Sequence, residues 1–141
     1  MTTRLQQQLI EMFHSAPIAR LFGMRLSYDT LGRAHLHLPY NANLDHAMGG
    51  IHGGTLATLL DCAGWFTSAA RHAGRWVSTS QLNVHLLEPA RGCALQAEGW
   101  IVRRGGRVDV AQMKVEGADG VLYAVGTGTF VVAEEMRLVN A

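Results

Sequence analysis

The sequence is poor in residues that stiffen or cross-link a chain, with three prolines and two cysteines among its 141 residues. Cys62 and Cys93 lie in apolar surroundings without the spacing of metal ligands, so we interpret both as buried thiols. The chain also lacks a large excess of either charge. Its formal net charge of +1 argues against a broad surface for nucleic acid, and we expect no nucleic-acid partner.

Long hydrophobic runs are absent as well. The longest stretches free of Asp, Glu, Lys and Arg end at Leu60 and at Ala133, and neither reaches the roughly 18 to 20 apolar residues of a membrane helix. The first residues include no apolar segment of the kind found in secretory signals. These absences predict a cytoplasmic protein that has no membrane partner.

Apolar residues are plentiful: 48% of the chain is hydrophobic and 16% is charged. This composition can form one sizeable core, and the length fits a single domain over residues 1–141. We expect an N-terminal helical segment over residues 1–23. Thr3 and Gln6 resemble the capping box of a helix, and Pro17 opens a second short helical turn.

The remaining periodicity predicts a sheet around one helix. A hairpin is expected over residues 24–40, a glycine-rich loop over 41–54, and a long helix over 55–73 with Gly74 as its C-cap. This helix is apolar on most sides, which is typical of a buried helix. Four strands are expected over residues 77–87, 95–103, 108–116 and 121–132. The pattern predicts an α+β fold in which one antiparallel sheet wraps around one central helix.

The segment His52-Gly53-Gly54 stands where the glycine-rich loop enters the long helix. The first N–H groups of a helix lack internal partners, and the helix dipole is positive there. Because glycine has no Cβ, a ligand oxygen can approach these N–H groups closely. The segment therefore favours an oxyanion-binding corner. The alternative is that the two glycines only turn the chain.

Asp61 lies two turns inside the same apolar helix. A carboxylate is costly to bury without partners, and helix interiors do not favour Asp. The residues on its own helical face are mostly small, which leaves room for a ligand or a partner chain: Gly54, Ala57, Thr58, Gly64, Trp65 and Ser68. The alternative is a structural Asp that bonds to a neighbouring hydroxyl such as that of Thr58.

Gly53 and Asp61 are eight residues apart, which corresponds to roughly 12 Å along a helix axis. One small reacting group could hardly touch both residues of the same chain. If both act on one carbonyl, a two-fold axis that brings Gly53 of one chain to Asp61 of another solves the problem. The spacing therefore indicates a catalytic dimer, on condition that both residues are functional.

Residues 43–132 resemble the hotdog-fold thioesterases of the PaaI type, in the group that includes 4-hydroxybenzoyl-CoA thioesterase. The matching features, in chain order, are His52-Gly53-Gly54, Asp61, Thr79, Val84-His85-Leu86-Leu87-Glu88-Pro89, Asp119-Gly120 and Gly126-Thr127-Gly128-Thr129-Phe130. The resemblance implies a hotdog fold and hydrolysis of an acyl-CoA thioester, with aryl and phenylacetyl groups among the candidate acyl groups. It also implies a homo-oligomer, with an obligatory dimer and an expected tetramer, and no cofactor apart from the coenzyme A of the substrate.

The resemblance implies a role for each matching position. Asp61 would attack the thioester carbonyl or activate a water, and the Gly53 N–H would hold the developing oxyanion. Thr79 would place the water or the carboxylate, and His52 is expected to shape the loop through backbone bonds. His46 departs from the family, where this position often carries Asn. An imidazole can still bond to a water or carbonyl, but its charge varies with pH.

Other residues have a functional and a structural interpretation. Gly54 and Trp65 are candidates for substrate binding, although tryptophan is more often part of a core. Arg103, Arg104 and Arg107 cluster at an expected hairpin, where they would meet coenzyme A phosphates or simply be solvated. The seven histidines show no metal-ligand pattern, so we expect no metal site.

Two other functions compete with thioester hydrolysis. A non-catalytic acyl-CoA-binding module would normally carry a DNA-binding appendage, for which 141 residues leave no space. A hotdog hydratase or dehydratase would need an Asp–His pair that moves a proton on the acyl chain, and Asp61 has no recognisable partner motif of this kind.

Overall fold

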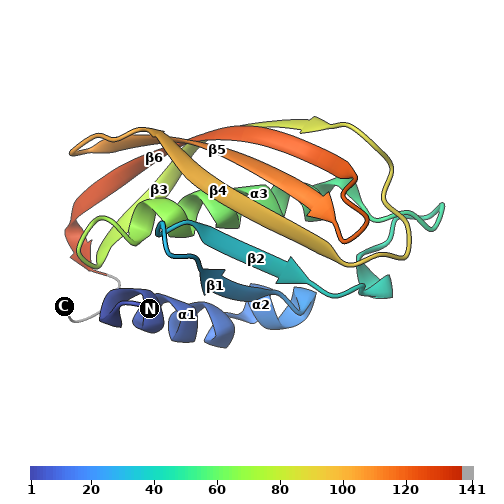
Figure 1. The fold of residues 1–141 in the computed structure, drawn as a ribbon, viewed down its shortest axis with the longest axis horizontal. Coiled ribbons are helices and arrows are strands. Elements are labelled where there is room, and N and C mark those ends of the chain that lie inside the picture. Colours follow the sequence, from blue (N-terminus) through green and yellow to red (C-terminus); the bar gives the residue numbers. More distant parts are fainter. Residues whose placement is uncertain (138–141) are drawn as a thin grey trace.

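The computed structural model describes the backbone of residues 1–137 and the side chains of residues 1–133. Six strands form one antiparallel sheet in the order β1-β2-β4-β5-β6-β3. Their bounds are β1 Arg25–Tyr28, β2 Ala34–Leu38, β3 Arg75–Leu86, β4 Leu95–Arg103, β5 Val108–Gly117 and β6 Leu122–Arg137. The sheet curves around helix α3 (Gly53–Ala69), as Figure 1 shows. This confirms the α+β expectation of one sheet wrapped around one central helix.

The N-terminal segment is helical, as predicted. Thr3 and Gln6 form a capping box at the start of α1 (Arg4–Ser15), and α2 (Pro17–Phe22) ends at Gly23 in the left-handed conformation. These two helices lie beside β1 at one edge of the sheet (Figure 1). The Leu26 N–H donates to His14 Nε2 at 3.0 Å, which ties α1 to β1.

Helix α3 differs from the prediction at both ends. It begins at Gly53 instead of residue 55, because the His52 side chain caps it. It ends at Ala69 with Ala70 as the C-cap, so the predicted end at residue 73 and the predicted Gly74 cap are wrong. The chain tightens into turns after Ala70, and Gly74, with φ of 80°, then redirects it into β3.

The core lies between α3 and the concave face of the sheet. Leu59, Leu60 and Ala63 on α3 are fully buried, as are Met113 on β5 and Phe130 on β6. One stripe of α3 is only partly buried and consists of Gly54, Ala57, Thr58, Asp61, Cys62 and Trp65. Strand β3 is an edge of the sheet over 12 residues. The described residues leave this stripe of α3 and the outer side of the β3 edge uncovered.

Candidate active site

The first turn of α3 presents one unpaired backbone donor. His52 Nδ1 accepts a hydrogen bond from the Gly54 N–H at 2.8 Å, which confirms that His52 shapes the loop through the backbone. The Thr55 N–H donates to the His52 carbonyl at 2.9 Å. Among the described residues, the Gly53 N–H has no acceptor. A Cβ at Gly53 would lie 2.6 Å from Leu86 Cδ1, so only glycine fits here without a shift of Leu86.

A cavity of about 290 Å³ opens beside this amide. Its lining is mostly apolar and comes from the loop, the start of α3 and the end of β3: His46, Ile51, Gly53, Leu56, Leu86, Leu87, Glu88, Pro89 and Ala90. His46 Nδ1 accepts from the Met48 N–H at 3.1 Å, so in a neutral ring Nε2 carries the proton. The cavity therefore combines apolar walls with two donors, the Gly53 N–H and His46 Nε2.

Leu86 and Leu87 were not among the predicted site residues, although both line this cavity. They are 56% and 47% exposed, which is unusual for two adjacent leucines and indicates a surface that receives something apolar. The sequence does mark this position, because two adjacent leucines break the alternation of apolar and polar residues that is expected of a half-exposed strand.

Asp61 sits in the middle of α3, on the exposed stripe. Its Oδ1 accepts a hydrogen bond from the Thr79 hydroxyl of β3 at 2.7 Å. The alternative partner considered from the sequence is wrong, because the Thr58 hydroxyl donates to the Gly54 carbonyl at 2.9 Å. One carboxylate oxygen is thus held by Thr79, and no described residue donates to Oδ2.

The neighbouring thiol is a poor nucleophile. Burial, followed by the charge of Asp61, raises the pKa of Cys62 to about 12. A thiol with such a pKa is almost fully protonated at neutral pH, and the thiolate is the reactive form. Of the two adjacent side chains, Asp61 is therefore the one that could act as a nucleophile or base.

The structure keeps Asp61 apart from the Gly53 cavity. Gly53 is the first residue of α3, and Asp61 follows eight residues later in the same unbroken helix, at a rise that corresponds to roughly 12 Å. Asp61 and Thr79 do not line the cavity that holds Gly53 and His46. The predicted catalytic residues therefore form two groups within one chain.

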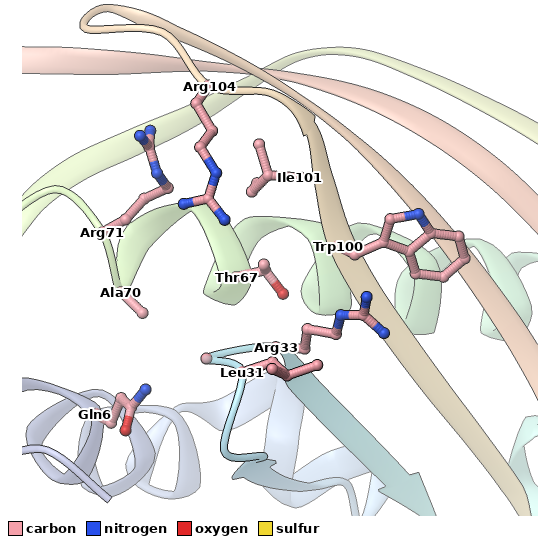
Figure 2. Close-up of a pocket in the computed structure, with 10 residues that line it drawn as sticks. Gln6, Leu31, Arg33, Thr67, Ala70, Arg71, Trp100, Ile101 and Arg104 are labelled. Carbon is pink, nitrogen blue, oxygen red and sulfur yellow. The ribbon is translucent and has the colours of Figure 1, made fainter.

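The residues predicted to bind substrate are dispersed. The Trp65 indole donates to the Val77 carbonyl at 2.6 Å, and its ring packs against Phe66 and Trp76. Arg103, Arg104 and Arg107 lie at the β4–β5 hairpin, as expected. Only Arg104 of these three lines a second cavity, of about 330 Å³, which is drawn in Figure 2.

One group of side chains has the composition of a metal site. Ligand atoms of Asp29, His35 and Glu98 lie within 4.8 Å of one another. Arg33 donates to Glu98 Oε1 at 2.9 Å, and Lys114 Nζ lies 3.8 Å from Glu98 Oε2. Two cations already neutralise this carboxylate, which disfavours a divalent ion in the same place.

The fold, one antiparallel sheet curved around one central helix, is that of the hotdog-fold domains of the PaaI type. Residues 48–124 match the family model of the Thioesterase superfamily, and the chain belongs to this superfamily. A candidate esterase of Halobacterium salinarum is 36% identical over 113 residues, covering 72% of this chain and 74% of that protein. The membership supports thioester hydrolysis as the general activity and confirms the family and the fold predicted from the sequence.

Solved structures agree with the fold. PaaI of E. coli, from the phenylacetic acid degradation operon, has a TM-score of 0.86 at 18% identity and covers 96% of this chain and 97% of its own. The BH2602 protein of Bacillus halodurans, solved with CoA, has a TM-score of 0.80 at 26% identity and covers 94% and 96%. Among the residues that the structure describes, no helix is long and apolar enough to cross a membrane.

Proposed function

We propose that the protein hydrolyses an acyl-CoA thioester to a free acid and coenzyme A. The observation that carries this proposal is the Asp61–Thr79 pair on the exposed stripe of the central helix, in a member of the Thioesterase superfamily. Thr79 holds Oδ1 at 2.7 Å and leaves Oδ2 available for a carbonyl carbon or a water. A carboxylate fixed by one hydrogen bond is ready to act without first being reoriented.

The reaction divides between the two groups of residues. The Gly53 N–H and His46 Nε2–H would donate to the thioester oxygen, where negative charge develops. Asp61 Oδ2 would attack the carbonyl carbon or take a proton from an attacking water. The C–S bond then breaks, and the coenzyme A thiolate leaves and takes up a proton. If Asp61 is the nucleophile, a water then hydrolyses the acyl–Asp61 anhydride, which releases the free acid and restores the carboxylate. The apolar walls beside Gly53, including Leu56 and Leu86, would receive the acyl group.

The donors Gly53 and His46 can meet the Asp61–Thr79 pair only if the site is shared between two chains. The β3 edge leaves 12 residues unpaired on one side, and such a long edge is normally covered. Pairing of β3 with β3 of a second chain would bring the exposed stripes of the two α3 helices together in opposite directions. Gly53 of one chain would then approach Asp61 of the other. We propose an obligatory dimer, and a tetramer formed from two such dimers.

Coenzyme A is the proposed carrier of the acyl group, and no other cofactor is proposed. The Bacillus halodurans structure, which contains CoA, is similar over most of this chain. Arg103 and Arg107 are exposed at the β4–β5 hairpin, and arginine pairs well with phosphate oxygens. We propose these two arginines for the phosphates of CoA, whereas Arg104 points into a separate cavity.

A panel of acyl-CoA substrates tests the proposal. Release of free thiol is measured for straight-chain, phenylacetyl and benzoyl thioesters, and hydration of enoyl-CoA is measured beside it. We expect thiol release that depends on Asp61 and no hydration. Hydration without thiol release would favour the hydratase alternative, and binding without turnover would favour a non-catalytic module.

A further inference from the structure

Strand β3 leaves one row of backbone groups open. Just past the strand, the Leu87 N–H donates to the Tyr123 carbonyl of β6 at 2.8 Å. Because the backbone groups of successive residues in a strand point to opposite sides, those of Leu82, Val84 and Leu86 point away from β6. In the part of the chain that the structure describes, no strand lies on this side of β3. Three alternate residues of the β3 edge can therefore pair with a strand of another chain.

The side chains of β3 that face α3 follow an alternation that is interrupted once. They are Val77, Thr79, Leu82, Val84 and Leu86. Two residues separate Thr79 from Leu82, whereas one residue separates every other neighbouring pair of this set. The pairing with β6 shifts by one between Thr79 and Gln81, which leaves Ser80 as the extra residue of a β-bulge. The bulge keeps both halves of β3 facing the helix.

Two positions on β3 mark the two halves of the candidate active site. A Cβ at Gly53 would lie 2.6 Å from Leu86 Cδ1, so Leu86 marks the position of the oxyanion donor. Further back along the strand, the Thr79 hydroxyl donates to Asp61 Oδ1 at 2.7 Å, so Thr79 marks the carboxylate. In the shared site proposed above, Gly53 of one chain approaches Asp61 of the other. Leu86 of one chain must then lie opposite Thr79 of the other.

We propose that the two β3 strands pair antiparallel with Asn83 of one chain directly opposite Asn83 of the other. A two-fold axis perpendicular to the sheet keeps the two faces in common, so only residues of the same face can lie opposite each other. With the axis at Asn83, counting along regular strands sets Leu86 opposite the partner's Ser80. Because Ser80 is the extra residue of the bulge, Leu86 meets the partner's Thr79 instead. The choice of Asn83 rests on the proposed function, because the shared site selects this register among those that the faces allow.

The same register satisfies the open backbone groups. Leu82 would lie opposite the partner's Val84, and the two residues would exchange two hydrogen bonds. The symmetry repeats this pair on the other side of the axis. Asn83 is exposed on the outer face, and its backbone groups point towards β6, so it forms a non-hydrogen-bonded pair with its own copy. The edge is thereby covered without leaving the groups of Leu82 and Val84 unpaired.

A matching centre exists on the helices. The midpoint between Gly53 and Asp61 is residue 57, so an axis that exchanges these two positions passes beside Ala57 of each chain. Ala57 is only partly buried within one chain, and its side chain is a single methyl group. Two α3 helices can therefore approach each other closely at this point. Strand and helix are both compatible with one two-fold axis.

The register predicts a disulfide between two copies of one introduced cysteine. The Cα atoms of a non-hydrogen-bonded antiparallel pair lie about 4.5 Å apart, which is within the range of disulfides. Asn83→Cys in the full-length protein, treated with oxidised glutathione, should therefore give a covalent dimer on a non-reducing gel. His85→Cys is the matched control, because it lies on the same face but its two copies would be about 13 Å apart.

The amount of covalent dimer is the measurement. We expect at least about tenfold more of it for Asn83→Cys than for His85→Cys or the wild type, because only the first pair of thiols lies within bonding distance. All three proteins retain Cys62 and Cys93, so the wild type gives the background from these two thiols. Light scattering before oxidation should show that each protein is already a dimer or tetramer.

A second experiment tests the register without a substitution on the axis. Gln81 of one chain would lie opposite the partner's His85, on the outer face. Gln81→Cys and His85→Cys should each stay unlinked when oxidised alone. An equal mixture that has exchanged subunits at random should form covalent dimer in up to about half of its dimers, since half of them are mixed. This mixture decides the register if Asn83→Cys does not fold.

Three results would overturn the register. One is the absence of covalent dimer from folded Asn83→Cys, or from the mixture. Another is more covalent dimer from Gln81→Cys or His85→Cys alone than from Asn83→Cys, which would move the axis. The third is a monomer in light scattering.

The register and the hydrolysis are read separately. The oxidised Asn83→Cys dimer should keep thiol release within about twofold of the wild type, because Asn83 faces away from both halves of the site. Covalent dimer at Asn83→Cys together with no thiol release from the wild type would refute the hydrolysis and leave the register standing. Thiol release from a protein that forms no such dimer would refute the register alone.

Discussion

At the scale of single residues, the position of Asp61 is the feature that best distinguishes this protein from a purely structural domain. It occupies the middle of a helix whose other faces are buried, yet it lies on the stripe that remains accessible. Its hydrogen bond comes from Thr79 on β3, 18 residues away in the chain. A carboxylate held in this way has one oriented oxygen and lies on the partly accessible side of the helix.

Asp61→Asn tests the role of this oxygen. The amide keeps the shape and can still bond to Thr79, but it removes the nucleophile or base. General-base contributions are about 10²- to 10⁴-fold, so we expect kcat for thiol release to fall at least about a hundredfold. Circular dichroism and the unfolding midpoint should match the wild type. A variant that keeps more than about a third of wild-type kcat would exclude the assignment.

Asp109 is a second buried carboxylate, with a structural role. It is fully buried on β5 and accepts hydrogen bonds from Ser68, His72 and Arg71 of the α3 end and from the Gly105 N–H. Burial by itself raises the pKa of Asp109, but these hydrogen bonds together outweigh it and hold the pKa below its usual value. The ionised group therefore ties the end of α3 to the β4–β5 hairpin.

Asp109→Asn should be destabilising, and the effect should depend on pH. Removal of one partner from a buried charged network costs about 3 kcal/mol or more. Because the folded pKa is lowered, ionised Asp109 stabilises the fold above its unfolded pKa of about 3.9 and loses this contribution as the pH falls below it. The difference in unfolding free energy between wild type and variant should be largest at neutral pH and shrink below about pH 4. Urea unfolding over this pH range measures it, and a pH-independent difference would contradict the account.

At the scale of elements, Gly99 is a position where the sheet approaches the helix backbone closely. A Cβ on Gly99 of β4 would lie 2.5 Å from the Ala63 carbonyl oxygen of α3 and 3.0 Å from the Gly64 nitrogen. These are backbone atoms of a buried helix, so they cannot move aside as a flexible side chain does. The missing side chain at Gly99 therefore lets α3 pack directly on β4.

Gly99→Ala should push α3 away from the sheet. Overpacking of a core typically costs about 1 to 3 kcal/mol, and a rigid backbone neighbour places this substitution in the upper part of that range. Gly106→Ala is the matched control, since a Cβ there meets no atom within 4 Å, and it should change stability by less than about 0.5 kcal/mol. The urea midpoint is the measurement. Equal midpoints for both variants would show that the close approach relaxes freely.

At the scale of the whole molecule, one chain is incomplete in two respects. Within the described part of the chain, no strand pairs with the outer side of β3. The predicted catalytic residues are split between a cavity near Gly53 and the Asp61–Thr79 pair. A two-fold partner along β3 would resolve both. The dimer is thus a requirement of the proposed chemistry as well as of sheet edge protection.

Oligomerisation should be obligatory for activity. Light scattering should give a dimer or tetramer at all concentrations at which thiol release is measured, and we expect the tetramer. Dilution into a monomeric form should abolish the activity, because Gly53 and Asp61 of one chain lie too far apart. A fully active monomer would contradict the shared-site proposal.

Mixing two inactive variants tests the shared site directly. Gly53→Pro removes the N–H donor, which typically costs about 10²- to 10³-fold in kcat, and Asp61→Asn removes the carboxylate. In a mixed dimer with shared sites, one site carries both lesions and the other carries none. Equal amounts that exchange subunits at random should regain about a quarter of wild-type sites. If each site is built within one chain, mixing would restore no thiol-release activity. As a control, Gly53→Pro must first be shown to fold and to dimerise.

The sequence alone determined the elements, because they follow from local patterns. The capping box at Thr3, the change from helical to alternating periodicity, and the turns between strands produced helices and strands close to those observed. It also singled out Asp61 and His52-Gly53-Gly54, since a carboxylate in an apolar helix and glycines at a helix start stand out against their neighbours. The predicted end of α3 lies too far along the chain. Local helix propensity favours continuing the helix past Ala69, but Arg71 and His72 bond to Asp109 of β5, and the chain turns there instead.

Only the tertiary structure decided which residues meet across the chain. It selected Thr79 and not Thr58 as the partner of Asp61, it placed Arg104 in a cavity with Gln6, and it left β3 at the edge of the sheet. These contacts join residues far apart in sequence, and each depends on strand order and on the face that a strand or helix presents. The spacing of apolar residues shows which face of a helix or strand is buried, but it does not show which other element packs against that face.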